Sequence, residues 1–301
     1  MEVLSSYQNG NTQVTIFNDG SLERKFLEPN NIKVDFPSSL DVKITNYCDA
    51  GCAFCHEQST VAGQHGDLNE LSRVLAPLPA GVEVAIGGGN PLAHPELTPF
   101  LERCKAQGLI CNITINQQHV ESYKENIINF INNKLIYGIG ISYSSSTYLN
   151  SIDPILLATN NLVFHLIMGI NKINDIETLM SFCKERNKEC KVLLLGCKHY
   201  GFGIDYYLKN KKIEDNKYEW YTKLAQYFKQ SNLVLAFDNL AISQLNLKRY
   251  FTESAWGTFY MGDDFQYTMY VDAVNKQYAP SSCSANRVSF NSQSLLEFFK
   301  K

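Results

Sequence analysis

The sequence predicts an α/β protein with a parallel sheet covered by helices. From Leu40 onward, short segments rich in Val, Ile and Leu alternate about six times with longer segments of helical period, the pattern of strands joined by crossover helices. The chain has 301 residues, 45% of them hydrophobic, enough for a large packed core. Periodicity does not separate a barrel from an open doubly wound sheet, but both bind ligands at the carboxyl ends of the strands.

The elements follow in order along the chain. Strands are expected at Asp41–Thr45, Val82–Gly87, Ile110–Ile115, Tyr137–Ser142, Leu162–Gly169, Lys191–Leu195 and Leu233–Phe237. Helices are expected at Leu68–Leu75, Pro95–Gln107, Val120–Asn132, Asp175–Asn187 and Asn216–Gln230. Function is therefore expected just after each strand.

Two hairpins flank this region. Asn18-Asp19-Gly20 is a turn signal between the alternating segments Thr12–Phe17 and Ser21–Phe26. Near the other end, Thr258–Tyr260 and Gln266–Asp272 are expected to pair, and Ser294–Lys300 to form a closing helix. We divide the chain into an N-terminal hairpin extension (1–39), the α/β body (40–239) and a C-terminal hairpin and helix (240–301).

Composition argues against several classes of protein. The net charge of −3 provides no positive field for generic nucleic-acid binding. The longest apolar runs fall short of the ~20 residues that a membrane span needs, and the first residues lack the layout of a signal peptide. We therefore expect a cytoplasmic protein.

Three of the nine cysteines lie within eight residues, at Cys48, Cys52 and Cys55. The C-x3-C-x2-C spacing lets three thiolates from one loop ligate three irons of a [4Fe–4S] cluster and leave the fourth iron without a protein ligand. Structural zinc is an alternative, although it needs four closed ligands and no second C-x2-C pair exists. An electron-transferring cluster completed by Cys197 or Cys283 is another.

This loop resembles that of the radical S-adenosylmethionine (radical SAM) superfamily. The family's C-x3-C-x-aromatic-C motif is matched by the three cysteines together with Phe54. Gly87-Gly88-Gly89-Asn90-Pro91 stands where the family holds the amino group of SAM, with Asn90 in place of the usual Glu. Without the family, these glycines are a plain turn or an anion-binding nest. The resemblance implies a partial (β/α)6 barrel over 40–239.

The resemblance also implies cofactors, chemistry and partners. One [4Fe–4S] cluster per chain, reduced by a donor such as flavodoxin or ferredoxin, would cleave SAM to a 5′-deoxyadenosyl radical that abstracts a substrate hydrogen atom. The SAM contacts would come from Phe54, Gly87, Gly88, Gly89, Asn90, Asn116, Ser142 and Leu195. We expect a peptide or protein residue as substrate. A small metabolite or nucleotide, and a non-catalytic iron–sulfur or SAM-binding sensor, are the alternatives.

The C-terminal region resembles the outline of a SPASM or twitch domain, through Tyr260-Met261-Gly262, a hairpin to Asp272 and then Cys283. It lacks the cysteines for an auxiliary cluster, and an unrelated hairpin is the alternative. Cys197 and Cys283 are candidate hydrogen-atom donors to a substrate radical, or else packing residues. Further candidates at the ends of the strands are His56, Glu57, Lys198, His199, Asp238 and Asn239.

Overall fold

The computed structural model describes residues 2–28 and 32–300. Its strands are β1 (Val3–Asn9), β2 (Thr12–Phe17), β3 (Leu22–Phe26), β4 (Ser39–Thr45), β5 (Glu83–Gly88), β6 (Ile110–Asn116), β7 (Gly138–Ser142), β8 (Leu162–Ile167), β9 (Cys190–Leu195), β10 (Leu233–Phe237), β11 (Thr268–Asp272), β12 (Gln277–Ala279) and β13 (Val288–Ser289). A ten-stranded sheet runs in the order β10-β9-β8-β7-β6-β5-β4-β11-β12-β13. From β10 to β11 all neighbours are parallel. The predicted α/β fold is confirmed.

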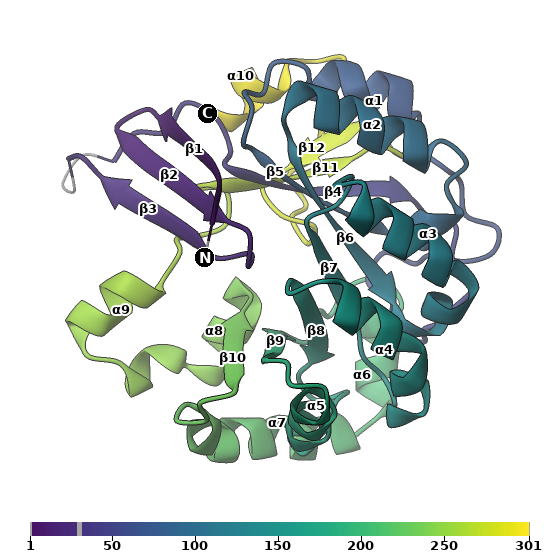
Figure 1. Ribbon diagram of the computed structural model, residues 1–301, viewed down its shortest axis with the longest axis vertical. Coiled ribbons are helices and arrows are strands. Elements are labelled where there is room, and N and C mark those ends of the chain that lie inside the picture. Colours follow the sequence, from purple (N-terminus) through teal and green to yellow (C-terminus); the bar gives the residue numbers. More distant parts are fainter. Residues whose placement is uncertain (1, 29–31, 301) are drawn as a thin grey trace.

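Most of the helices connect the parallel strands. The helices are α1 (Leu68–Leu75), η1 (Pro91–Ala93), α2 (Leu97–Gln107), η2 (Gln117–His119), α3 (Val120–Asn132), η3 (Ser146–Tyr148), α4 (Leu149–Ala158), α5 (Asp175–Glu185), α6 (Gly203–Lys209), α7 (Lys212–Lys223), η4 (Leu224–Tyr227), α8 (Asn239–Leu245), η5 (Leu247–Tyr250), α9 (Glu253–Phe259) and α10 (Leu295–Phe299). Figure 1 shows the strands curving into a partial barrel with α1 to α5 on its outer side. Within the described ranges, no helix has the length and apolar character to cross a membrane.

The main core lies between the outer face of the sheet and these helices. In β4, Leu40, Val42 and Ile44 are buried in that core. Because side chains alternate along a strand, Asp41 and Lys43 point to the opposite, inner face. The same alternation in β5 to β9 places apolar side chains outward and mostly polar or small ones inward. Burial of the outer side chains stabilises the barrel and leaves the inner face for function.

The N-terminal hairpin is confirmed and is larger than predicted. Strands β2 and β3 pair around the expected turn, where Gly20 has a φ of 85°, and β1 adds a third antiparallel strand. Val14 and Ile16 of this small sheet pack on Ile110 at the start of β6. The small sheet therefore contacts the barrel at the amino end of that strand, away from the ends expected to bind ligands.

The C-terminal hairpin pairs differently from the prediction. Thr258–Tyr260 was expected as a strand, which is wrong, because residues 258 and 259 end α9. This helix is capped by the Thr252 side chain, and its Phe259 stacks on Phe251. The observed hairpin is β11 with β12, and β11 also pairs in parallel with β4. The closing helix is confirmed as α10.

Candidate active site

The three clustered cysteines lie on the loop of residues 46–58 that follows β4, called here the cysteine loop. Backbone hydrogen bonds shape it: Cys55 N donates to Cys52 O over 3.1 Å, and Cys48 N to Thr60 O over 2.9 Å. All three thiols are free and partly exposed. A cavity of about 300 Å³ is lined by Cys48 and Cys52 together with Phe202. The loop thus presents three thiols near the carboxyl end of the first barrel strand.

The donor set fits a cluster better than a single ion. Among the described residues, the ligand atoms that fall within 4.8 Å of one another belong to Cys48, Asp49 and His119, and not to the three cysteines. Burial and the two neighbouring thiols raise the pKa of Cys52 to about 11. A positive metal centre reverses this penalty because it binds thiolates. Three soft sulfur donors spread over one loop suit an iron–sulfur cube.

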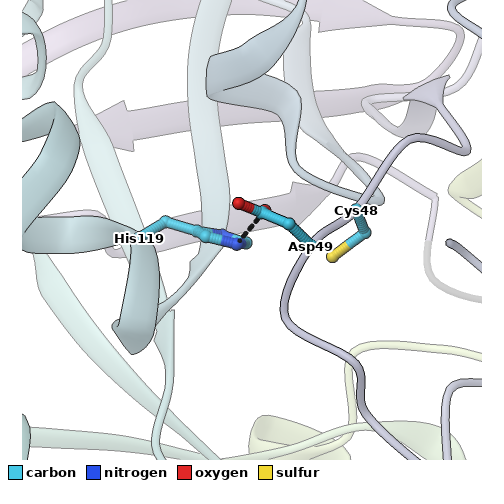
Figure 2. Close-up of side chains that lie close together, drawn as sticks. All are labelled: Cys48, Asp49 and His119. Carbon is cyan, nitrogen blue, oxygen red and sulfur yellow. Dashed lines mark ion pairs between the residues drawn. The ribbon is translucent and has the colours of Figure 1, made fainter. Parts of the chain in front are cut away.

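A close contact between a histidine and an aspartate joins the cysteine loop to the segment that follows β6. His119 Nε2 lies 2.8 Å from Asp49 Oδ1 (Figure 2), and the His119 side chain is only 6% exposed. Burial lowers the pKa of His119, while Asp49 opposes that shift. His119 belongs to η2, directly after β6. Sequence reasoning missed it, although its place just after a strand was an available signal.

The glycine motif packs against the backbone of the cysteine loop. Gly89 N donates to Thr45 O over 2.8 Å, and Asn90 N donates to Tyr47 O over 2.6 Å. A Cβ on Gly89 would lie 2.1 Å from the Tyr47 carbonyl oxygen, whereas a Cβ on Gly87 would meet no described heavy atom within 4 Å. Gly89 is therefore needed for close packing, and Gly87 leaves its backbone open to a ligand.

Asn90 departs from the family motif and is fully enclosed. It is 0% exposed, and within the described ranges neither Oδ1 nor Nδ2 has a hydrogen-bond partner. A buried amide without partners is costly. Such orphaned polar atoms beside the cysteine loop are compatible with a polar ligand or ordered water.

The remaining predicted SAM contacts lie at the ends of several strands. Asn116, the last residue of β6, donates from Nδ2 to Cys52 Sγ over 3.4 Å. It pairs in register with Ser142 at the end of β7. Leu195 ends β9 on the inner face. The Phe54 ring meets Tyr206 of α6 edge-on, with centroids 5.5 Å apart.

The two candidate donor thiols have different surroundings. Cys197 is 1% exposed, its Sγ contacts the Met168 carbonyl oxygen, and burial raises its pKa to about 11. Cys283 is partly exposed, and its Sγ lies 3.8 Å from Ser282 Oγ. Lys198 Nζ donates to that same Ser282 oxygen over 3.2 Å. Cys283 is therefore the more accessible thiol of the two.

Sequence reasoning missed two titratable groups on the inner face, His165 and Asp41. His165 alternates with the buried Phe164 and Leu166 in β8, and its ring lies over Gly140 of β7. Burial and the nearby Lys198 lower the pKa of His165 to about 4. Burial raises the pKa of Asp41, and Lys198 opposes that shift. The signal was available, because a polar residue at an alternating position of a buried strand points inward.

Comparison with known proteins identifies chains that share this fold and the family to which the sequence belongs. Two similar solved structures are Streptococcus suis SuiB bound to precursor peptide SuiA (TM-score 0.62, 16% identity, 89% of this chain and 65% of that chain) and SuiB bound to S-adenosylmethionine (0.61, 14%, 89% and 66%). This chain thus spans just under two thirds of SuiB, and at this identity the likeness concerns the fold. A comparison with curated protein sequences finds no match. The model of the radical SAM superfamily matches residues 42–196, more than half of the chain, so the protein belongs to the radical SAM superfamily.

Proposed function

We propose that this protein is a radical SAM enzyme that modifies a residue of a peptide or protein. Cys48, Cys52 and Cys55 would hold one [4Fe–4S] cluster per chain. The open backbone at Gly87, with Asn116 and Ser142 at the neighbouring strand ends, would hold SAM beside it. When bound, these groups supply a 5′-deoxyadenosyl radical through one-electron reduction of SAM. The observation that carries the proposal is the packing of the glycine motif onto the cysteine loop.

The chain's own residues orient the ligands and provide room for a substrate. On the inner face of β7, Gly138 and Gly140 are covered by the side chains of Asn161 and His165, whereas a Cβ on Gly87 of β5 would meet no described heavy atom within 4 Å. Asp41 of β4 also points to the inner face, and Val234 of β10 is 42% exposed. Because a reactive radical attacks the nearest C–H bond, holding the substrate in this space decides which atom reacts.

A peptide substrate is supported by the likeness to SuiB, one structure of which contains a precursor peptide. That likeness covers 89% of this chain. It rests on the fold, so the substrate is a proposal to be tested on this protein itself.

We further propose that Cys283 quenches the substrate radical. The thiol would transfer its hydrogen atom to the substrate carbon, forming a C–H bond and a thiyl radical. One electron from the flavodoxin or ferredoxin class of donor and one proton would restore the thiol. Partial exposure of Cys283 favours it over Cys197, which is enclosed.

The test combines the reconstituted protein, SAM and dithionite with synthetic short peptides encoded beside its gene. We expect peptide-stimulated 5′-deoxyadenosine and a mass or deuterium change in one peptide, resolved by mass spectrometry. Turnover of a small molecule with every peptide unchanged would favour the metabolite alternative. A bound cluster and bound SAM without any cleavage would favour the sensor alternative.

A further inference from the structure

The carboxylate of Glu57, two residues after Cys55, contacts two side chains of the sheet, and a third lies next to one of them. Its Oε2 lies 2.9 Å from Lys43 Nζ on β4, and its Oε1 accepts a hydrogen bond of 2.8 Å from the Tyr270 hydroxyl on β11. Lys43 Nζ also lies 3.2 Å from Asp272 Oδ2 on β11. The end of the cysteine loop is therefore connected to a strand more than 200 residues away in the sequence.

These groups are shielded from water, so their contacts weigh more than surface pairs do. The exposed fractions of the side chains are 5% for Lys43, 14% for Glu57 and 4% for Asp272. Removing one member of a buried ionic group leaves an uncompensated charge and is strongly destabilising. Burial and Glu57 raise the pKa of Tyr270, so its hydroxyl stays protonated and donates.

The register of the sheet fixes where these side chains stand. Asp272 lies opposite Lys43, and Tyr270 opposite Asp41, in the parallel pairing of β11 with β4. Asp272 Oδ1 also accepts hydrogen bonds from the amides of Val274 and Asn275, which holds its carboxylate in the following turn. Backbone amides therefore hold the Asp272 carboxylate at the end of β11, and Lys43 connects this carboxylate to Glu57 of the cysteine loop.

A second link joins the C-terminal segment to the cysteine loop. Lys198 Nζ lies 3.5 Å from His56 Nε2 and donates to Ser282 Oγ over 3.2 Å. The Arg287 guanidinium stands over the Tyr270 ring, 4.9 Å from its centroid. Residues 270–287 therefore contact the loop directly at Glu57 and are linked to His56 through Lys198.

We propose that Tyr270 and Asp272 are positioning residues for the cysteine loop, acting through Lys43 and Glu57 to hold Cys55 in place. Strand β11 would then help to fix the position of a cysteine that ligates the cluster. The inference goes beyond the proposed function, because it concerns how the loop is held before any cluster or SAM binds.

The first test is hydrogen exchange on the cluster-free full chain. Tyr270→Phe should speed exchange of the amides in residues 52–58 by about tenfold or more, the effect of losing a hydrogen bond to a charged group. Tyr278→Phe is the matched control, because Tyr278 is a buried tyrosine of the adjacent β12 that packs on Phe290 and Phe298. It should leave exchange in the loop unchanged.

The second test asks whether the contacts act as one unit. Glu57→Gln keeps an acceptor for Tyr270 but removes the charge that pairs with Lys43. The double variant with Tyr270→Phe should then change the alkylation rate of Cys55 by less than the product of the two single effects. In reconstituted protein, Tyr270→Phe should also broaden or shift the electron paramagnetic resonance signal of the reduced cluster.

The proposal would be overturned if loop exchange and Cys55 alkylation in Tyr270→Phe matched wild type, or if the two substitutions acted independently. If Tyr270→Phe unfolds, Glu57→Gln alone gives the same decision through loop exchange. Because both readouts need neither SAM nor a cluster, they remain decisive even if the protein proves to be a sensor.

Discussion

The side-chain amide of Asn116 donates a hydrogen bond from Nδ2 to the Sγ of Cys52 over 3.4 Å. Hydrogen bonds to cluster sulfurs help set the reduction potential of iron–sulfur sites. Asn116→Ala should therefore make the cluster harder to reduce, with a more negative potential in a redox titration. Ser145→Ala is the matched control, since Ser145 caps the corresponding helix after β7. Equal reduction potentials in Asn116→Ala and wild type would show that Asn116 does not hydrogen-bond a sulfur of the cluster site.

Two substitutions in the glycine motif should have different effects, one on the stability of the fold and the other on SAM binding. Gly89→Ala would place a methyl group 2.1 Å from the Tyr47 carbonyl oxygen and should cost about 1–3 kcal/mol of unfolding free energy. Gly87→Ala meets open space, so it should keep the melting temperature while weakening SAM binding about tenfold, as a clash of ~1.4 kcal/mol would. Calorimetry of both variants checks this.

A suitable control is Gly257→Ala, another position where a Cβ meets open space, on α9. It should leave SAM binding unchanged and should not lower the melting temperature, because Ala is more favourable than Gly inside a helix. Unaltered SAM affinity in Gly87→Ala would place SAM elsewhere on the inner face.

His165 should make the fold sensitive to acid. Its pKa is lowered to about 4, so between the ordinary value of 6.5 and 4 the unfolded chain takes up a proton that the folded chain does not. Stability from this position is therefore lost as pH falls through that window. Between pH 7.5 and 4.5, the unfolding free energy of His165→Gln should fall by about 1–2 kcal/mol less than that of wild type. Urea unfolding of the cluster-free protein at both values measures the difference.

A pH dependence of the unfolding free energy in His165→Gln equal to that of wild type would mean that His165 does not cause this sensitivity to acid.

Substitutions of the two candidate thiols should have opposite effects on deuterium incorporation from deuterated water. With turnover established, Cys283→Ala should abolish solvent deuterium incorporation into the product but still form 5′-deoxyadenosine. Cys197→Ala should incorporate deuterium as wild type does, because its thiol is buried against the Met168 carbonyl. Deuterium incorporation that survives in both variants would exclude a thiol donor from these positions.

Much of the barrel could be predicted because its elements carry strong local patterns. Leu68–Leu75 and Val120–Asn132 have the bounds of α1 and α3, since both have an apolar stripe of helical period. Helix α4 was missed, and it contains Pro154, which normally argues against a helix interior. The pairing of β11 with β4 was also missed, because register between strands so far apart in sequence has no local signature.

In the site too, local motifs could be predicted from the sequence and long-range contacts could not. The cysteine loop and the glycine motif are short and local, so their spacing indicated them directly. The contacts of Asp49 with His119 and of Glu57 with Tyr270 join separate elements. Nothing in the neighbouring residues specifies such partners, and only the folded arrangement reveals them.

The most direct test of the radical chemistry uses anaerobically reconstituted protein. Iron and sulfide are counted, and 5′-deoxyadenosine is assayed after addition of SAM and dithionite, with a Cys48→Ala, Cys52→Ala, Cys55→Ala triple variant as control. The account predicts about four irons per chain and 5′-deoxyadenosine that disappears in the triple variant. Zinc in place of iron, or equal 5′-deoxyadenosine from the triple variant, would contradict it.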